Sequence, residues 1–109
     1  VTYRLGGGVL RDTFRSGKAE TGFTGLRFRL GCAKGPCRLV VRYGSQEGGA
    51  DLGEARINLK AGQAAGGWYD AVVAARKLAP RRRYFVELRG EGEGTSLFGV
   101  RPLGGDALA

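Results

Sequence analysis

An adjacent pair of aromatic residues, Trp68 and Tyr69, offers the clearest chemistry in this chain. The pair follows Gly66-Gly67 and precedes Asp70, and Trp68 is the only tryptophan. A sugar ring presents an apolar face that can stack on an aromatic side chain, and an aromatic residue with a polar tip suits such a half-wet contact. Strand alternation would direct the two rings to opposite faces. We therefore expect Trp68 and Tyr69 to form a sugar-stacking site with one ring exposed; the alternative is that Trp68 fills the core.

Four arginines are the expected polar partners of such a site. Arginine donates several N–H groups in a planar fork, so it can bind sugar hydroxyls or hold a carboxylate bidentately. The four are Arg27, Arg29, Arg38 and Arg42. The chain carries 18 basic and 10 acidic residues, a net charge of +8, which favours a polyanionic partner such as an acidic polysaccharide. Two alternatives remain: the arginines only keep the domain soluble, or a basic sheet face binds nucleic acid with Tyr69 or Phe85 stacking on bases.

Catalysis by this chain is not expected, because the usual reactive groups are missing. There is no histidine, so neither a Ser-His nor a Cys-His pair can form. The carboxylates are scattered, and nothing in the sequence pairs them as a glycosidase would require: Asp12, Glu47, Asp51, Glu54, Asp70 and Glu87. We expect no cofactor. A structural Ca²⁺ held by Glu47, Asp51 and carbonyls near Gly48-Gly49 is the one metal considered.

Two cysteines lie at the ends of a short loop inside the segment from Leu26 to Tyr43. Each flanking run alternates apolar and polar residues, which is typical of half-buried strands, and Lys34-Gly35-Pro36 supplies turn residues. We predict a β-hairpin whose outer face carries all four arginines. Because the spacing from Cys32 to Cys37 fits no common zinc pattern, a disulfide is expected, with a reduced pair as the alternative. A disulfide implies an extracellular or periplasmic location.

The rest of the chain is a series of short strands separated by glycine-rich turns. Of its 109 residues, 21 are glycine, and no apolar run approaches the length of a membrane span. Besides the hairpin, strands are expected over residues 1–5, 9–15, 52–59, 68–75, 84–88 and 95–100. About eight strands with turns every ten residues or so are typical of an all-β antiparallel sandwich. We expect residues 1–109 to be one such domain of a larger protein.

Several segments together resemble a known type of domain. They are Asp12-Thr13-Phe14, the runs 24–30 and 37–43, Gly49-Ala50-Asp51-Leu52 with the strand after it, Trp68-Tyr69-Asp70, and the proline turn leading into 84–88. Across roughly residues 10–101 the chain resembles the jelly-roll accessory domains found beside catalytic domains in bacterial glycoside hydrolases and other secreted proteins. The resemblance implies a non-catalytic carbohydrate-binding module. The alternative is a structural sandwich that packs against a neighbouring catalytic domain and has no ligand of its own.

Overall fold

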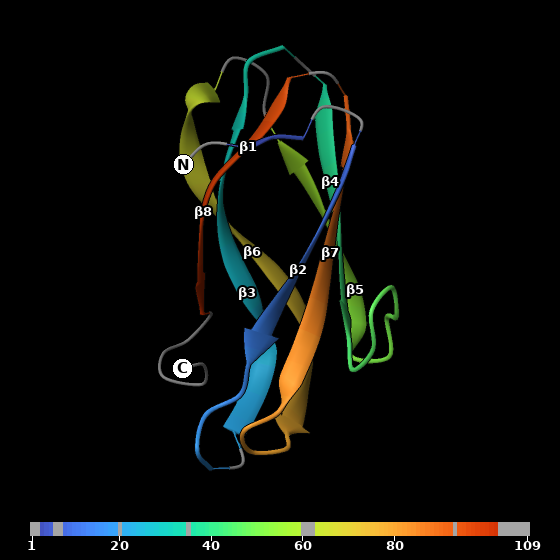
Figure 1. The fold of residues 1–109 in the computed structure, drawn as a ribbon. Helices are drawn as coiled ribbons and strands as arrows, with labels where there is room; N and C mark the ends of the chain where they lie inside the picture. Colours follow the sequence, from blue (N-terminus) through green and yellow to red (C-terminus); the bar gives the residue numbers. More distant parts are fainter. Residues whose placement is uncertain are drawn as a thin grey trace.

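All regular secondary structure in the described part of the domain is β-strand. The computed structural model describes residues 3–5, 8–19, 21–34, 36–59, 63–92 and 94–102, and Figure 1 shows their arrangement. The strands are β1 (Tyr3–Arg4), β2 (Val9–Arg15), β3 (Thr21–Cys32), β4 (Cys37–Gly44), β5 (Gly53–Leu59), β6 (Gln63–Leu78), β7 (Arg83–Glu91) and β8 (Thr95–Pro102). No helix in this part of the chain is long and apolar enough to cross a membrane.

The strands form two packed four-stranded sheets in jelly-roll order. One sheet has the order β1-β8-β3-β6 and the other β2-β7-β4-β5. The antiparallel pairs β1·β8, β2·β7, β3·β6 and β4·β5 make the chain a long double strand folded back at the β4–β5 loop. Rolling this double strand up places successive pairs in alternate sheets and adds the contacts β3·β8 and β4·β7. This is the two-sheet jelly roll expected from the sequence.

The core lies between the sheets and is filled by alternate residues of each strand. In β4 the buried positions are Cys37, Leu39, Val41 and Tyr43. In β3, Leu26, Phe28 and Leu30 are likewise almost fully buried. An aromatic cluster closes one end of the core, where Phe23 packs at 5.1 Å from Tyr43 edge to face and at 5.3 Å from Phe14 in a stacked arrangement. Burial of these side chains is the main favourable term that holds the two sheets together.

The predicted β-hairpin between Leu26 and Tyr43 is wrong. β3 pairs with β6 and β8, whereas β4 pairs with β5 and β7, so the chain crosses from one sheet to the other between Cys32 and Cys37. The alternation of apolar residues was interpreted correctly as two half-buried strands. It reports only that each strand has one face toward a core, and a strand on either side of the sandwich satisfies that condition.

The predicted disulfide is confirmed, and its role follows from this crossing. Cys32 and Cys37 are bonded, with their Cα atoms 6.0 Å apart and both residues almost fully buried. Cys32 ends β3 and Cys37 begins β4. The bond therefore ties the two sheets to each other at one end of the sandwich.

Replacing both cysteines by alanine should lower the free energy of unfolding by about 2 kcal/mol. Closing a ring of this size removes about that much chain entropy from the unfolded state. For a domain of this size the midpoint of thermal unfolding should fall by roughly 10 °C, which differential scanning calorimetry measures. Reduction of the unaltered protein should give a similar fall, and an unchanged midpoint in both experiments would show that the bond contributes nothing to stability.

Candidate functional site

The four arginines proposed as ligand-binding residues do not lie on one surface. Arg27 and Arg29 project from β3 on the outer face of the β1-β8-β3-β6 sheet, together with Trp68 from β6. Arg38 and Arg42 project from β4 on the outer face of the other sheet. The four arginines were expected on one face of a hairpin. They lie in two pairs on opposite sides of the molecule, because β3 and β4 belong to different sheets.

The first of these surfaces is the outer face of the β1-β8-β3-β6 sheet, called here the Trp68 face. Its centre is a row of three cross-strand neighbours: Trp68 on β6, Arg29 on β3 and Gly99 on β8. A Cβ placed on Gly99 would lie 3.6 Å from the Cη2 atom of Trp68. The indole therefore reaches from its own strand across β3 to β8, over a span of two strand spacings. It remains 40% exposed, so the alternative that Trp68 fills the core is wrong.

Arg101 of β8 stacks on this indole. Its guanidinium carbon lies 4.2 Å from the centroid of the Trp68 ring, well inside the range of a cation–π contact. Nothing in the local sequence relates residues 68 and 101, since β6 and β8 are brought together only through β3. Sequence reasoning missed Arg101 for this reason.

A second row of the Trp68 face supplies both a carboxylate and guanidinium groups. Asp70, Arg27 and Arg101 are cross-strand neighbours on β6, β3 and β8. The Nε atom of Arg27 donates to Oδ1 of Asp70 at 2.6 Å, and both side chains are about two-fifths exposed. This hydrogen bond, together with the carboxylate charge, raises the pKa of Arg27 above its ordinary value. Arg101 lies directly opposite Arg27, so this row of three residues has a net positive charge.

Phe98 and Gly66 complete the surroundings of Arg29. The β3–β8 register shifts between Arg29 and Leu30, which leaves Phe98 as an extra residue in β8. The guanidinium of Arg29 lies 5.9 Å from the Phe98 ring centroid. A Cβ on Gly66, whose φ is +85°, would lie 2.9 Å from that ring, so glycine is needed for β6 to pass this close. Two arginines of this sheet thus lie against aromatic rings, Arg29 against Phe98 and Arg101 against Trp68.

Tyr69, the second residue of the expected stacking pair, faces the other way. It lies opposite Phe28 in the β3–β6 register and packs partly buried against the core. The expectation that only one of the two adjacent rings is exposed is confirmed, and the exposed ring is Trp68. Tyr69 is therefore not part of the Trp68 face.

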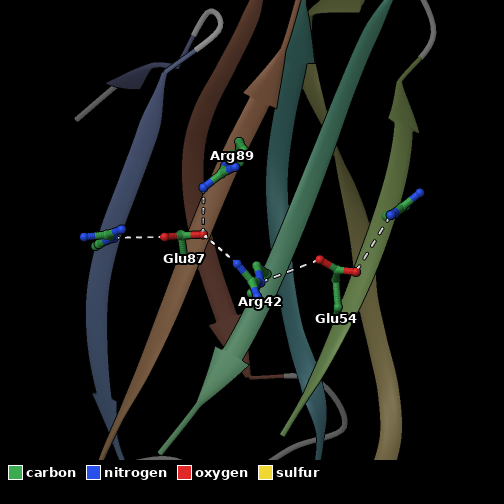
Figure 2. A network of polar contacts seen from close by, with 6 residues as sticks. Arg42, Glu54, Glu87 and Arg89 are labelled. Carbon is green, nitrogen blue, oxygen red and sulfur yellow. Dashed lines mark hydrogen bonds and ion pairs between the residues drawn. The ribbon is translucent and has the colours of Figure 1, made fainter. Parts of the chain in front are cut away.

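The opposite surface is the outer face of the β2-β7-β4-β5 sheet, called here the Glu87 face. A row of alternating charges crosses its four strands: Arg11, Glu87, Arg42 and Glu54. Figure 2 shows Glu87 between arginines, with Arg42 placed between Glu87 and Glu54. Opposite charges on neighbouring strands stabilise a sheet, so this row contributes to its pairing.

Glu87 is the centre of that row and is only 3% exposed. Its Oε1 atom accepts a hydrogen bond from Nε of Arg11 at 2.9 Å. Its Oε2 atom lies 3.5 Å from Arg89 and 3.8 Å from Arg42. A buried carboxylate is tolerated when cations surround it, and this explains why a glutamate occupies a covered position. Arg38, at the end of the same face, donates from Nε to Oδ1 of Asn58, so the arginines of β4 are engaged in contacts within the sheet.

Hydrogen bonds between Ser45 and Asp51 stabilise the loop in which Glu47 and Asp51 were expected as possible Ca²⁺ ligands. Oδ1 of Asp51 accepts from the backbone N–H of Ser45 at 2.8 Å, and Oδ2 accepts from the Ser45 hydroxyl at 2.7 Å. These bonds, the hydroxyl first, lower the pKa of Asp51. Glu47 is exposed in the same loop. Within the described ranges, no group of three or more acidic, cysteine or histidine side chains is placed to hold a metal ion.

Comparisons with known proteins do not assign this domain to a family. Neither the protein-family models nor the curated proteins searched include a match to the chain. The class of protein is therefore defined by the fold alone, an all-β antiparallel jelly roll with one disulfide.

Proposed function

We propose that the domain is a non-catalytic carbohydrate-binding accessory module and that the Trp68 face is its ligand-binding surface. The observation that carries the proposal is the exposed indole of Trp68, which reaches from β6 across β3 to β8 among Arg29, Arg101 and the Arg27–Asp70 pair. An indole can stack on the apolar face of a sugar ring. Guanidinium and carboxylate groups around it can then donate to and accept from the hydroxyls.

The charge of the Trp68 face favours a polysaccharide that contains acidic sugars. Among the described residues, Arg27 and Arg101 share their row with a single carboxylate, that of Asp70. A sugar carboxylate could be held bidentately by Arg101, and the sugar ring could stack on Trp68 once this guanidinium moves aside from the indole. The Cys32–Cys37 disulfide is compatible with an extracellular or periplasmic setting, where such polymers occur. In this proposal the domain forms part of a larger secreted protein.

Replacing Trp68 by alanine should weaken binding to the preferred glycan by at least about tenfold, which corresponds to 1.4 kcal/mol. The ligand is first selected on a glycan array that includes neutral and uronic-acid polysaccharides, at low and at physiological salt. Isothermal titration calorimetry then compares the unaltered protein with Trp68→Ala. An affinity that does not change in Trp68→Ala contradicts the proposed surface.

A charge-matched pair of variants separates specific binding from general attraction. Arg101→Ala and Arg38→Ala each remove one positive charge, but Arg38 lies on the Glu87 face. Arg101→Ala should weaken binding of a uronic-acid polymer several-fold more than Arg38→Ala. Equal losses that disappear at higher salt would show only a screened attraction to the net charge.

The second candidate function is a structural one, in which the domain packs against a neighbouring domain. The exposed apolar side chain of Val72 favours this function. This side chain is 57% exposed on the same strand as Trp68 and Asp70. An apolar contact between domains would use Val72 as well as Trp68, whereas sugar stacking would not. Val72→Ser should therefore leave glycan binding unchanged if the domain is a carbohydrate-binding module.

A further inference from the structure

A group of cations lies at one end of the sandwich, beyond the charged row of the Glu87 face, where β2 ends at Arg15 and β7 begins at Arg83. The connection from β2 to β3 and the connection from β6 to β7 meet there, as the blue and orange loops at the bottom of Figure 1. Five exposed basic residues lie in or beside these two loops. They are called here the loop-end cations: Arg15, Lys18, Arg81, Arg82 and Arg83.

Hydrogen bonds join the two loops into one unit. The backbone N–H of Ser16 donates to the carbonyl of Arg82 at 2.9 Å, and the N–H of Arg82 donates to the Ser16 hydroxyl at 2.9 Å. The Ser16 hydroxyl in turn donates to the carbonyl of Ala79. The N–H of Arg81 donates to the carbonyl of Gly17 at 2.8 Å. Ser16 is only 3% exposed, so its bonds are shielded from water. Together with the Arg81–Gly17 bond, they fix the backbone that carries the cations.

Among the described residues, no acidic side chain pairs with the positive charges of this unit. Arg15 and Arg83 lie directly opposite each other in the β2–β7 register, an arrangement of like charges that disfavours strand pairing. Within the described part of the chain, none of the loop-end cations forms an ion pair. This differs from the Glu87 face, where Arg11, Arg42 and Arg89 share one buried carboxylate.

Arg81 has a left-handed backbone conformation that is usually adopted by glycine. Arg81 has a φ of +54°, and it is the only non-glycine residue with positive φ among those described. A side chain in this conformation costs free energy that glycine would not pay. Such a cost at a site of concentrated charge is a reason to look for a function. Arg81 lines a hollow of about 250 Å³ together with Arg15, Ser16, Gly17 and Lys18.

We propose that this hollow binds a phosphate or sulfate group. A tetrahedral oxyanion offers acceptors in several directions at once, which suits the planar forks of Arg15 and Arg81 and the point charge of Lys18. Its charge would relieve the repulsion between Arg15 and Arg83. The group could be a free ion or a substituent of a polymer, since both present the same chemistry. This proposal does not depend on sugar binding at the Trp68 face.

The test uses ¹⁵N-labelled protein and inorganic phosphate as the probe. Amide resonances of Gly17, Lys18 and Arg81 should shift saturably with phosphate, and chloride at the same ionic strength should not reproduce the shifts. The informative variant is Arg81→Gly, which removes the guanidinium and also relieves the backbone conformation. It should therefore fold at least as stably as the unaltered protein while its phosphate affinity falls about fivefold or more.

Two controls keep the outcomes separate. Arg56→Ala removes one exposed charge on the Glu87 face and should leave the phosphate affinity within twofold. Trp68→Ala should also leave it unchanged, so failure of the sugar proposal and failure of this one can be told apart. Shifts that chloride reproduces, or equal losses in Arg81→Gly and Arg56→Ala, would overturn the site.

The source of the oxyanion is distinguished by a second titration with dextran sulfate. Tighter binding than inorganic phosphate, through the same loop amides and with the same sensitivity to Arg81→Gly, identifies a group carried by a polymer. Equal affinity per anionic group identifies a free ion. Shifts concentrated on the sheet faces instead of the loops would again contradict the proposal.

Discussion

Gly25→Ala should leave the chain largely unfolded under conditions in which the unaltered protein is folded. Gly25 has a φ of +125°, and a Cβ at this position would lie 2.0 Å from the carbonyl oxygen of Ala71. The contact is with backbone, so no side-chain rotation can relieve it. β3 and β6 would have to separate at this point. We expect a loss of about 4 kcal/mol or more, which is a large part of the total stability of an ordinary domain.

Gly22→Ala is the matched control in the same strand. A Cβ on Gly22 meets nothing within 4 Å, and its φ is not in the left-handed region. This variant should unfold within about 0.5 kcal/mol of the unaltered protein. Urea titration followed by circular dichroism measures both changes. A Gly25→Ala protein that unfolds at the same urea concentration as the Gly22→Ala protein would refute the assignment of this close approach.

Tyr43→Phe is expected to cost about 3 kcal/mol, although it removes a single oxygen atom. The Tyr43 hydroxyl donates to the carbonyl of Ala71 at 2.9 Å and accepts from the N–H of Leu26 at 2.8 Å. Tyr43 is fully buried, and it belongs to β4 in the opposite sheet. The hydroxyl thus bonds β3 and β6 across the core. Phenylalanine would leave a buried donor and a buried acceptor without this partner, at roughly 1–3 kcal/mol each.

The pH dependence of unfolding gives Tyr43→Phe a second readout. Burial raises the pKa of Tyr43 above the ordinary value near 10, and the N–H of Leu26 opposes this only in part. Below pH 10 the tyrosine is protonated in both states, so it gives no slope. Above pH 10 the unfolded chain loses a proton that the folded chain keeps. The free energy of unfolding should then fall by up to about 1.4 kcal/mol per pH unit.

This alkaline loss should be absent in Tyr43→Phe. The two proteins differ only at residue 43, so the difference between their urea midpoints from pH 9 to 11 isolates the contribution of Tyr43. The two proteins should converge in stability as the pH rises. Parallel curves over that range would mean that the folded state does not hold this proton more tightly than the unfolded chain.

The strands themselves could be predicted from local patterns, and their partners could not. Residues 9–15 were expected as a strand and form β2 with the same bounds. The strand expected over 68–75 is present but begins earlier, at Gln63, because register with β3 and not residue type decides where pairing starts. The hairpin error has the same origin. A short loop between two amphipathic strands can join neighbours in one sheet or cross between two sheets, and the loop residues 33–36 do not distinguish these outcomes.

The residues of the candidate site were also predicted only where local sequence was sufficient. Trp68 was identified from its residue type and its place after two glycines, and Arg27 and Arg29 from strand alternation. Arg101 and Phe98 were missed because their position beside Trp68 and Arg29 depends on the β3–β8 register and on its shift after Arg29. Arg38 and Arg42 were placed on the wrong surface because the sheet to which β4 belongs is set by pairing with β5 and β7.

The order in which the strands pair also sets how quickly the chain can fold. Only β4 and β5 are neighbours both in sequence and in their sheet, and the loop between them is already held by the Ser45–Asp51 bonds. The pairs β3·β6, β2·β7 and β1·β8 close successively longer stretches of chain, and each adds loop-closure entropy that must be overcome before its contacts form. The fold therefore forms most easily if pairing starts with β4 and β5, continues with β3·β6 and β2·β7, and ends with β1·β8. Sandwiches dominated by such distant pairings fold in milliseconds to seconds, and during that time the edges of the unfinished sheets are open to other chains.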